Sequence, residues 1–554
     1  MLPRHLPRAI VMLAPKTNSD AWDWAADRLA VVTLFAIALI ALLTFRDYGL
    51  GWDDLTHAQY GEALVAFYTS GFANTEALSF VNLYMYGGGL DMMAALLHRI
   101  LPLDLFETRR LAGAAVGLAG LFITWRLGRR VAGAFGGLVA LVLLAICPLY
   151  YGHMFMNPKD MPFAVAMALL LLGLVKAFER YPRPPAATVA LFGLGLGLTV
   201  GSRIIGGLAA FYGAVALAFL MMGETSTLGW RVAVSRAGRF VLMLLPGVVL
   251  AYLVMGLVWP WGIMSPLNPL RAAEYFSHFF EKPWKEMFAG SLIQVTDMPR
   301  SYVPILFALR MPEVFLIFSV GGVILAVVEA ANPRIELQRR TVLIFLAAAA
   351  ILPVVFTVLT RPAMYNGIRH FVFVTPPLAV LGGYAAKLVI DRLRQYPRWQ
   401  FTAIAAFMLA IALPISDFVR LHPYQYTYFN RLAGGARGAD AAFMLDYWGL
   451  SLKQASEELR AQLDEKNERP PAGQVWRIAV CGPHAAAEIE LGPDFDPTWD
   501  PKGADFAMML GEFYCATLNA PIMVEIVRDG VVYARVYDIR GRSIGNLFTI
   551  PPVQ

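Results

Sequence analysis

Long apolar segments recur through most of this sequence, and they limit its fold more than any other feature. The first, residues 29–45, contains no charge and is about long enough to cross a bilayer as a helix. The stretch 186–222 would be roughly 55 Å long as one helix, so we expect it to turn near Arg203. We predict eleven membrane-spanning helices, at about 29–45, 111–127, 131–150, 161–178, 186–201, 204–222, 240–259, 314–331, 341–359, 371–390 and 400–418.

The composition also indicates an α-helical polytopic membrane protein. Hydrophobic residues make up 58% of the chain and charged residues 16%, whereas soluble proteins carry about 25% charged residues. The net charge of +6 comes mostly from short basic clusters between apolar segments, which gives no reason to expect a nucleic acid as partner. Three cysteines are too few for a disulfide scaffold, although Cys481 and Cys515 can pair in an oxidising compartment.

The basic clusters predict the orientation of the chain. Residues 1–16 are short and basic and lead to no cleavage site, so we expect the first span to stay as an anchor with a cytoplasmic N-terminus. With eleven spans, the later basic clusters fall on the same side. The opposite side then carries residues 46–110, 151–160, the turn at Arg203, 260–313, 361–370 and the C-terminal region. This predicts a multi-pass protein of a bacterial inner membrane with a periplasmic C-terminal region.

The external regions contain predicted structure of their own. Residues 56–70 and 89–101 have helical spacing and are expected to lie at the membrane surface or to pack against the spans. From about His422 the composition changes, which predicts a transmembrane module in residues 1–420 and a small periplasmic α/β domain in 421–554. In that domain we expect a helix at 451–463 and strands at 475–480, 506–510, 522–527 and 531–537, the last two joined as a hairpin by the turn at 528–530.

Four polar sites adjoin or interrupt the apolar segments. They are Asp53-Asp54, Lys159-Asp160, Arg203 and Arg369-His370, and the span count puts all of them on one side. Each site also has an ordinary explanation: a solvated loop, a local ion pair, an arginine that reaches the headgroups, or a boundary anchor. Ionisable residues at membrane depth are usually functional, so the common side favours one shared site.

These residue types suit a lipid phosphate, which lies at the same depth in a bilayer. Arg and Lys neutralise phosphate oxygens, and a nearby carboxylate can accept a proton from an incoming hydroxyl or amine. A leaving phosphate is a weak base, so it needs charge stabilisation more than a general acid. The pattern therefore indicates transfer of a group from a lipid phosphate to an acceptor.

The sequence resembles the GT-C membrane glycosyltransferases, specifically the branch of the protein O-mannosyltransferases and bacterial aminoarabinose transferases. The resemblance covers roughly residues 25–390 and rests on the order of three motifs. Asp53-Asp54 matches the family's Asp-Glu pair in the first external loop, with Asp in place of Glu. Residues 157–162 match the charged pair before a Pro-containing helix start, and 365–370 resemble the late external loop.

This resemblance implies an inverting glycosyltransferase that moves a sugar from a polyprenyl-phosphate donor to an acceptor at the periplasmic face. The acceptor is an unidentified glycan, lipid or protein, and membrane lipids are further partners. The site residues assigned are Asp53, Asp54 and Asp160 for catalysis; Lys159, Arg203, Arg369 and His370 for the donor phosphate; and Tyr86, Tyr151 and Tyr365 for acceptor or sugar. No cofactor is assigned; a divalent cation at Asp53-Asp54 stays open, although the family branch works without one.

Two other functional classes remain open from the sequence. A transporter or flippase for a lipid-linked sugar could use the same cations, but it is expected to have internal repeats or charged helices near the membrane midplane. The chain shows no repeat, and its special residues gather at one face. A non-catalytic assembly protein would not need its loops to converge, so the distances between Asp53, Asp160 and Arg203 discriminate among the three.

Overall fold

The computed structural model describes residues 18–277 and 284–550 and is mainly helical. The helices of the first half are α1 Asn18–Thr44, α2 Asp54–Thr69, α3 Gly89–His98, α4 Leu105–Ala145, α5 Pro148–Met156, α6 Asp160–Glu179, α7 Ala186–Ser202, α8 Leu208–Leu228, α9 Trp230–Val258, α10 Pro260–Met264 and α11 Asn268–Ser277. Those of the second half are α12 Tyr302–Arg310, α13 Glu313–Ala331, α14 Leu337–Thr360, α15 Thr375–Leu393, α16 Pro397–Leu421, α17 Gly435–Ala439, α18 Leu452–Glu465 and α19 His484–Leu491. The strands are β1 Lys285–Phe288, β2 Ser291–Gln294, β3 Trp476–Cys481, β4 Phe495–Thr498, β5 Phe506–Leu510, β6 Ile522–Arg528 and β7 Val531–Asp538.

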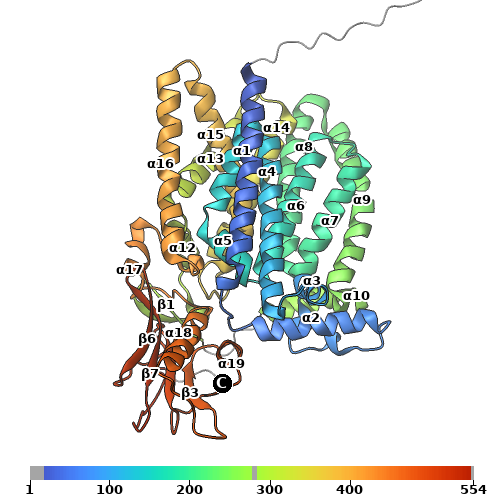
Figure 1. Cartoon of the computed structure of the whole chain (residues 1–554). Coiled ribbons are helices and arrows are strands. Elements are labelled where there is room, and N and C mark those ends of the chain that lie inside the picture. The colour runs from blue at the N-terminus through green and yellow to red at the C-terminus, as the bar shows by residue number, and fades with distance from the viewer. Residues whose placement is uncertain (1–17, 278–283, 551–554) are drawn as a thin grey trace, which may run out of the picture.

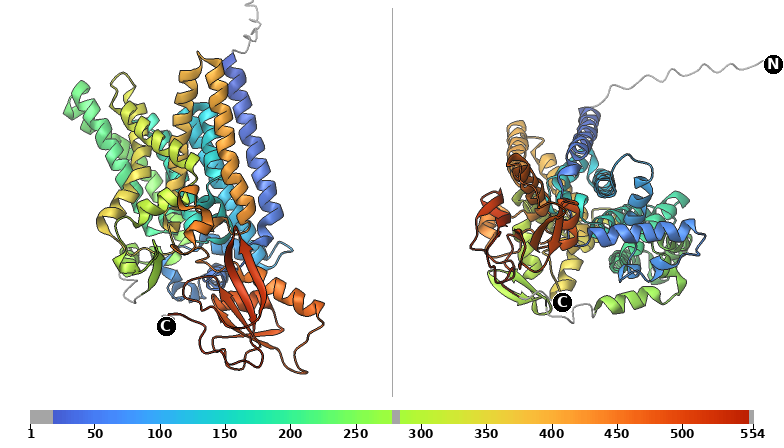
Figure 2. Two further views of the ribbon diagram at one scale, coloured as in Figure 1. Left: turned by 90° about the vertical axis from the view of Figure 1, so that its left-hand side faces the viewer. Right: turned by 60° about the horizontal axis from the view of Figure 1, so that its bottom comes forward.

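The predicted multi-pass helical architecture is confirmed. Within the described residues, nine helical segments are long and apolar enough to cross a membrane. The shorter α7 and the second limb of α4 account for the other two predicted segments. Figures 1 and 2 show the long helices side by side as an upright bundle, with α2 lying across one end and the C-terminal sheet beyond that end. We call this the sheet end of the bundle.

The predicted span 131–150 is corrected by the structure. Helix α4 folds back on itself at Gly133, whose φ of 73° breaks the helix. A Cβ on Gly137 would lie 2.7 Å from the backbone nitrogen of Arg129, so the two limbs touch beside the turn. The second limb ends at Ala145, and a separate helix, α5, begins at Pro148, which lacks the N–H that would continue the limb.

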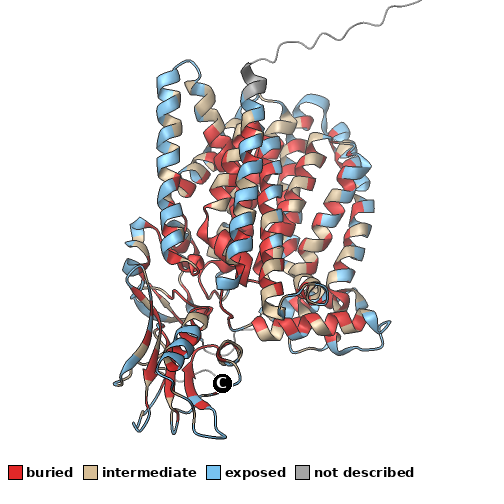
Figure 3. Ribbon diagram, viewed as in Figure 1, coloured by how far each residue is buried: buried red, intermediate tan, exposed pale blue. Residues whose placement is uncertain are grey.

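Burial separates a central layer of helices from an outer layer (Figure 3). Of the 18 most apolar consecutive residues in α6, 78% are buried. In α1 and α16 the corresponding share is 17%, and these helices expose apolar side chains. Exposed apolar surface of this extent fits contact with lipid. The central layer therefore positions the loops at the sheet end, and the outer helices face the membrane.

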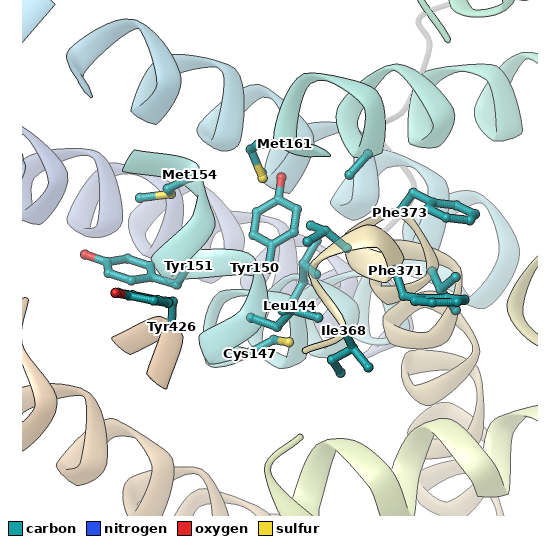
Figure 4. Packing of buried hydrophobic residues seen from close by; sticks show 14 of the residues in the cluster. Leu144, Cys147, Tyr150, Tyr151, Met154, Met161, Ile368, Phe371, Phe373 and Tyr426 are labelled. Carbon is teal, nitrogen blue, oxygen red and sulfur yellow. The ribbon is translucent and has the colours of Figure 1, made fainter. Parts of the chain in front are cut away.

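The core at the sheet end fixes the segments that carry polar residues. Figure 4 shows Tyr150 and Met154 of α5 in one cluster with Phe371 and Phe373 of the 3-10 helix Arg369–Val374. Phe163 of α6 packs edge-on against Phe373, with ring centroids 5.1 Å apart. This packing holds the start of α6 and the start of the 3-10 helix in a fixed relation.

The two helices predicted for the first external loop are present as α2 and α3. A buried polar triad joins them to the bundle: His57 Nδ1 lies 2.7 Å from Asp91 Oδ2, and Arg109 Nη2 donates to Asp91 Oδ1 over 2.7 Å. All three side chains are almost fully buried. Because breaking such a network leaves a buried charge unpaired, the triad fixes α2 and α3 on α4.

The C-terminal region contains a five-stranded sheet in the order β4-β3-β5-β7-β6. Strand β3 is parallel to β4 and β5, and β7 is antiparallel to β5 and β6. The predicted β6–β7 hairpin is confirmed: Arg528 pairs with Val531, and Asp529 and Gly530 have the positive φ of a two-residue hairpin turn. Cys481 and Cys515 form a disulfide. Strand β4, helix α19 and the β1–β2 hairpin were not predicted.

Residues 422–451 connect the last long helix to the sheet and are mostly buried. Tyr426 of this segment belongs to the same cluster as Tyr151 of α5 (Figure 4), and a Cβ on Gly152 would meet the Tyr426 backbone at 2.6 Å. The predicted boundary at residue 421 coincides with the end of α16, and it stays a prediction because the residues that follow pack against the bundle as well as the sheet.

Candidate functional site

The carboxylate of Asp53 is held at the start of α2 but is not used to cap it. Asp53 occupies the N-cap position without a side-chain capping bond, while its backbone carbonyl accepts from the N–H of His57 over 3.0 Å. Its side chain is 38% exposed. Asp54 behaves differently: it is buried, and its Oδ2 accepts from the N–H of Gly51 over 2.8 Å, so it stabilises the loop.

The start of α6 places Lys159 and Asp160 in different environments. Asn157 Oδ1 accepts from the backbone nitrogens of both residues, over 3.1 and 2.8 Å, and Asn157 Nδ2 donates to Asp160 Oδ2 over 2.8 Å. Lys159 Nζ lies 3.2 Å from Asp53 Oδ2. In the ion pairs of the structure Lys159 is joined to Asp53 and Asp160 to arginines, so the local Lys159–Asp160 pair that the sequence left open is not formed.

Two arginines from distant segments share Asp160. Arg203 follows α7 in extended conformation, and its Nη2 lies 2.7 Å from Asp160 Oδ1. Arg369, at the start of the 3-10 helix, places Nη1 3.7 Å from Asp160 Oδ2. The side chains of Asp160 and Arg369 are 3% and 4% exposed. The structure therefore joins all four predicted polar sites into one group, which we call the ionic cluster: Asp53, Lys159, Asp160, Arg203 and Arg369.

Aromatic rings adjoin the cations of this cluster. The ring of Tyr86 has Lys159 Nζ at 5.3 Å and the Arg203 guanidinium at 5.9 Å from its centroid. Tyr365 has the Arg369 guanidinium at 4.9 Å, and the His370 ring contacts Tyr365 edge-on at 5.0 Å. Two of the three predicted tyrosines thus lie at the cluster, and so does His370.

Tyr151 lies apart from the ionic cluster. Its ring is buried against Phe155 and Phe418, with centroids 5.5 and 5.3 Å away. No contact given for the described residues joins it to Asp53, Lys159 or the arginines. Its predicted contact with a sugar stays untested, and in this structure it packs the core between α5 and α16.

The cluster carries more positive than negative charge. Within residues 18–277 and 284–550, the ion pairs of Lys159, Arg203 and Arg369 involve two carboxylates, those of Asp53 and Asp160. Among the described residues, Arg203 Nε and Arg369 Nε and Nη1 are buried without a hydrogen-bond partner. Buried donors are costly unless something accepts from them, so this arrangement favours a bound anion.

The same charges set the acidity of Asp53. Burial raises the pKa of this carboxyl, but Lys159, His57 and Arg369 lower it further, to about 2. Asp53 is therefore ionised at neutral pH. In Asp54 the balance is reversed, because burial raises its pKa more than Arg110 and Arg109 lower it. The surroundings therefore lower the pKa of Asp53 and raise the pKa of the adjacent Asp54.

Several residues that support the cluster were not identified from the sequence. Glu286 is buried and accepts from Tyr302 Oη over 2.6 Å and from the backbone nitrogen of Gly367 over 3.3 Å, which holds the turn before Arg369. His153 Nε2 lies 2.9 Å from Tyr447 Oη and links the C-terminal region to Asn157. Glu286 lies on the short strand β1, which was not predicted and contains no motif, so no local signal indicated it.

The described residues contain no group of three or more His, Cys, Asp or Glu side chains placed to hold a metal ion. Asp53 pairs with Lys159, and Asp54 accepts a backbone bond, so the two adjacent carboxylates do not converge on one point. A divalent cation at Asp53-Asp54 stays untested.

No protein-family model and no curated protein matches the chain. Solved structures are similar to it. The apo oligosaccharyltransferase of Archaeoglobus fulgidus is 13% identical with a TM-score of 0.49, and the match covers 86% of this chain but only 65% of that protein. ArnT from Cupriavidus metallidurans bound to undecaprenyl phosphate is 16% identical with a TM-score of 0.46, covering 91% and 97%. These likenesses assign neither a family nor an activity to this chain.

Proposed function

We propose that this chain is an inverting glycosyltransferase that uses a polyprenyl-phosphate sugar at the periplasmic face of a bacterial inner membrane. The observation that supports this most is the buried surplus of positive charge beside one partly exposed carboxylate. Arg203, Arg369 and Lys159 supply the charge, and Asp53 is the carboxylate. A transferase needs both features within one site, because it must stabilise a leaving phosphate and accept a proton.

The donor phosphate binds to the surplus cations. The guanidinium groups of Arg203 and Arg369 have nitrogens without a hydrogen-bond partner among the described residues, and they can bind phosphate oxygens bidentately. Lys159 adds a point charge from the side of Asp53. The polyprenyl chain then lies among the lipid-facing helices, and the rings of Tyr86 and Tyr365 adjoin the position of the sugar.

Asp53 accepts the proton of the acceptor in the transfer step. The acceptor's hydroxyl or amine attacks the anomeric carbon, the bond from that carbon to the phosphate oxygen breaks, and polyprenyl phosphate leaves with the electron pair. Attack opposite the leaving group inverts the anomeric centre. The phosphate's negative charge also draws Lys159 away from Asp53, which raises the pKa of Asp53 from about 2 and makes it a better base.

The test is sugar transfer by the purified full chain in lipid vesicles, with a set of radiolabelled polyprenyl-phosphate sugars and candidate acceptors. We expect Asp53→Asn to lower transfer by about 100- to 10,000-fold, because the general base is lost. Glu76→Gln is the matched control, since Glu76 is an exposed carboxylate of the same external segment. It should transfer at the unaltered rate.

The same vesicles distinguish the transporter alternative. If the unaltered chain moves the lipid-linked sugar between leaflets without transferring it, and Asp53→Asn has no effect, the transferase proposal is wrong. Full transfer activity in a folded Asp53→Asn variant would also contradict it, because no second exposed carboxylate belongs to the ionic cluster described here.

A further inference from the structure

A turn of the C-terminal region, residues 446–449, contacts the candidate site from two directions. The Arg369 guanidinium carbon lies 4.9 Å from the ring centroid of Trp448 and 4.9 Å from that of Tyr365, so the cation is held between two rings. A Cβ built on Gly51 would lie 1.7 Å from Trp448 Cδ1, which means that the Gly51 backbone packs directly on the indole edge. One side chain therefore contacts both Arg369 and the loop that carries Asp53.

Four hydrogen bonds to the carboxylate of Asp446 hold this turn. The buried carboxylate of Asp446 accepts from the backbone nitrogens of Gly449, Leu450 and Ser451 over 2.9 to 3.1 Å, and also from the hydroxyl of Tyr426. Trp448 itself is 2% exposed. The hydrogen bonds hold the backbone of the turn, and burial confines the ring against its neighbours.

Other contacts tie the Asp53 loop to the same region. The N–H of Leu50 donates to Glu490 Oε1 over 3.1 Å, and Tyr48 Oη donates to Gln425 Oε1 over 3.0 Å. The loop is thus joined to the C-terminal region at Tyr48, Leu50 and Gly51. Trp448 Nε1 has no hydrogen-bond partner among the described residues, so the ring is placed here by its neighbours Gly51 and Arg369 and not by a bond of its own.

We propose that Trp448 is a positioning residue of the transferase site: its face orients Arg369 toward the donor phosphate, and its edge sets the place of the Asp53 loop. This rests on the proposed function. It gives the C-terminal region a direct part in the reaction, because the spacing between phosphate and base depends on a ring that this region supplies. An error of about 1 Å in such spacing can cost 100-fold in rate.

The experiment compares Trp448→Leu with Trp448→Phe in the purified, lipid-reconstituted full chain. Binding of a sugar-free polyprenyl phosphate is measured first, and transfer kinetics second. We expect Trp448→Leu to weaken phosphate binding about tenfold, since the cation–π contact with Arg369 is lost. We expect kcat to fall about tenfold as well, because the Asp53 loop loses its support. Trp448→Phe keeps a ring on the turn and should recover most of both losses.

Two further variants separate positioning from general destabilisation. Trp476→Leu removes another buried tryptophan of the C-terminal region, on β3 and away from the ionic cluster, and should leave binding and kcat unchanged in folded protein. The double variant Arg369→Gln, Trp448→Leu should bind phosphate almost as well as Arg369→Gln alone. The reason is that Trp448 influences phosphate binding through Arg369, which the first substitution has already removed.

Either of two results would overturn the inference while transfer by the unaltered chain stands: Trp448→Leu that binds and transfers normally, or Trp476→Leu that causes the same losses. A wild-type chain that neither binds polyprenyl phosphate nor transfers sugar would instead overturn the proposed function, and this inference with it.

Discussion

An exposed ion pair at one end of the helical bundle contrasts with a buried, shared carboxylate at the other end. At the end away from the sheet, Arg129 lies 2.7 Å from Asp27 in a one-to-one pair, with side chains 41% and 28% exposed. At the sheet end, Asp160 is shared by Arg203 and Arg369 and is almost fully buried. Exposed pairs contribute little because water competes with them, whereas a buried surplus of cations is costly without an anion. This difference supports the proposed binding of an anion at the sheet end.

The largest expected difference between the two ends is in stability. Asp160→Asn leaves Arg203 and Arg369 as buried charges without their carboxylate, and we expect the free energy of unfolding to fall by about 3–5 kcal/mol. Asp27→Asn, the matched change at the other end, should cost about 1 kcal/mol or less. Thermal unfolding in detergent checks both. Equal losses at the two ends would remove the distinction.

The next effect is on anion binding. Arg203→Gln removes one surplus cation, and we expect the affinity for polyprenyl phosphate to fall about 100-fold, or about 2.7 kcal/mol. Arg129→Gln makes the same chemical change in the exposed pair and should leave the affinity unaltered. A titration of each reconstituted variant with polyprenyl phosphate measures this. If Arg203→Gln binds as well as the unaltered chain, Arg203 only balances Asp160.

The smallest effect is a pH dependence of stability caused by Glu512. This carboxyl is buried like that of Asp160, but it has no ion pair with a cation among the described residues. Burial, with the nearby Asp446 adding to it, raises the pKa of Glu512 to about 8. The folded chain then keeps a proton that the unfolded chain loses above its ordinary pKa, 4.5. Stability therefore falls as pH rises from about 4.5 to about 8. We expect a loss of about 2 kcal/mol between pH 5 and 6.5.

Unfolding of Glu512→Gln over the same pH range tests the assignment. This variant should lose most of the slope, because it cannot release the proton. Glu525→Gln, a change on β6 where the carboxylate is paired with Arg535 at 2.7 Å, should keep the slope. A slope that persists in Glu512→Gln would assign it to another group.

The sequence was sufficient for features that depend on local patterns. Apolar length predicted the long helices, and the break after Ser202 was predicted because one helix of that length cannot fit a bilayer. Charge asymmetry put Asp53, Lys159, Arg203 and Arg369 on one side, and the structure brings their side chains together. Their roles stay predictions, but their proximity is observed.

Features that depend on contacts between distant segments were out of reach. Nothing local in the sequence shows that the ring of Trp448 meets Gly51 and Arg369. The sequence predicted two spans, 111–127 and 131–150, where the structure has one helix, α4, that turns back at Gly133. The end of the second limb was missed because apolar length alone does not show where a helix ends. Tyr151 resembled the other boundary tyrosines in its sequence context, yet its ring points into the core.

The position of Trp448 late in the chain determines when the proposed site can form during synthesis. Asp53 leaves the ribosome early, and Trp448 only after the last long helix, α16. The ring that supports the Asp53 loop is therefore missing until all the spanning helices have been made. A partly synthesised chain would hold lipid-facing helices and an exposed carboxylate but no aligned base. If Trp448 positions the site as proposed, transfer begins only once membrane insertion is complete.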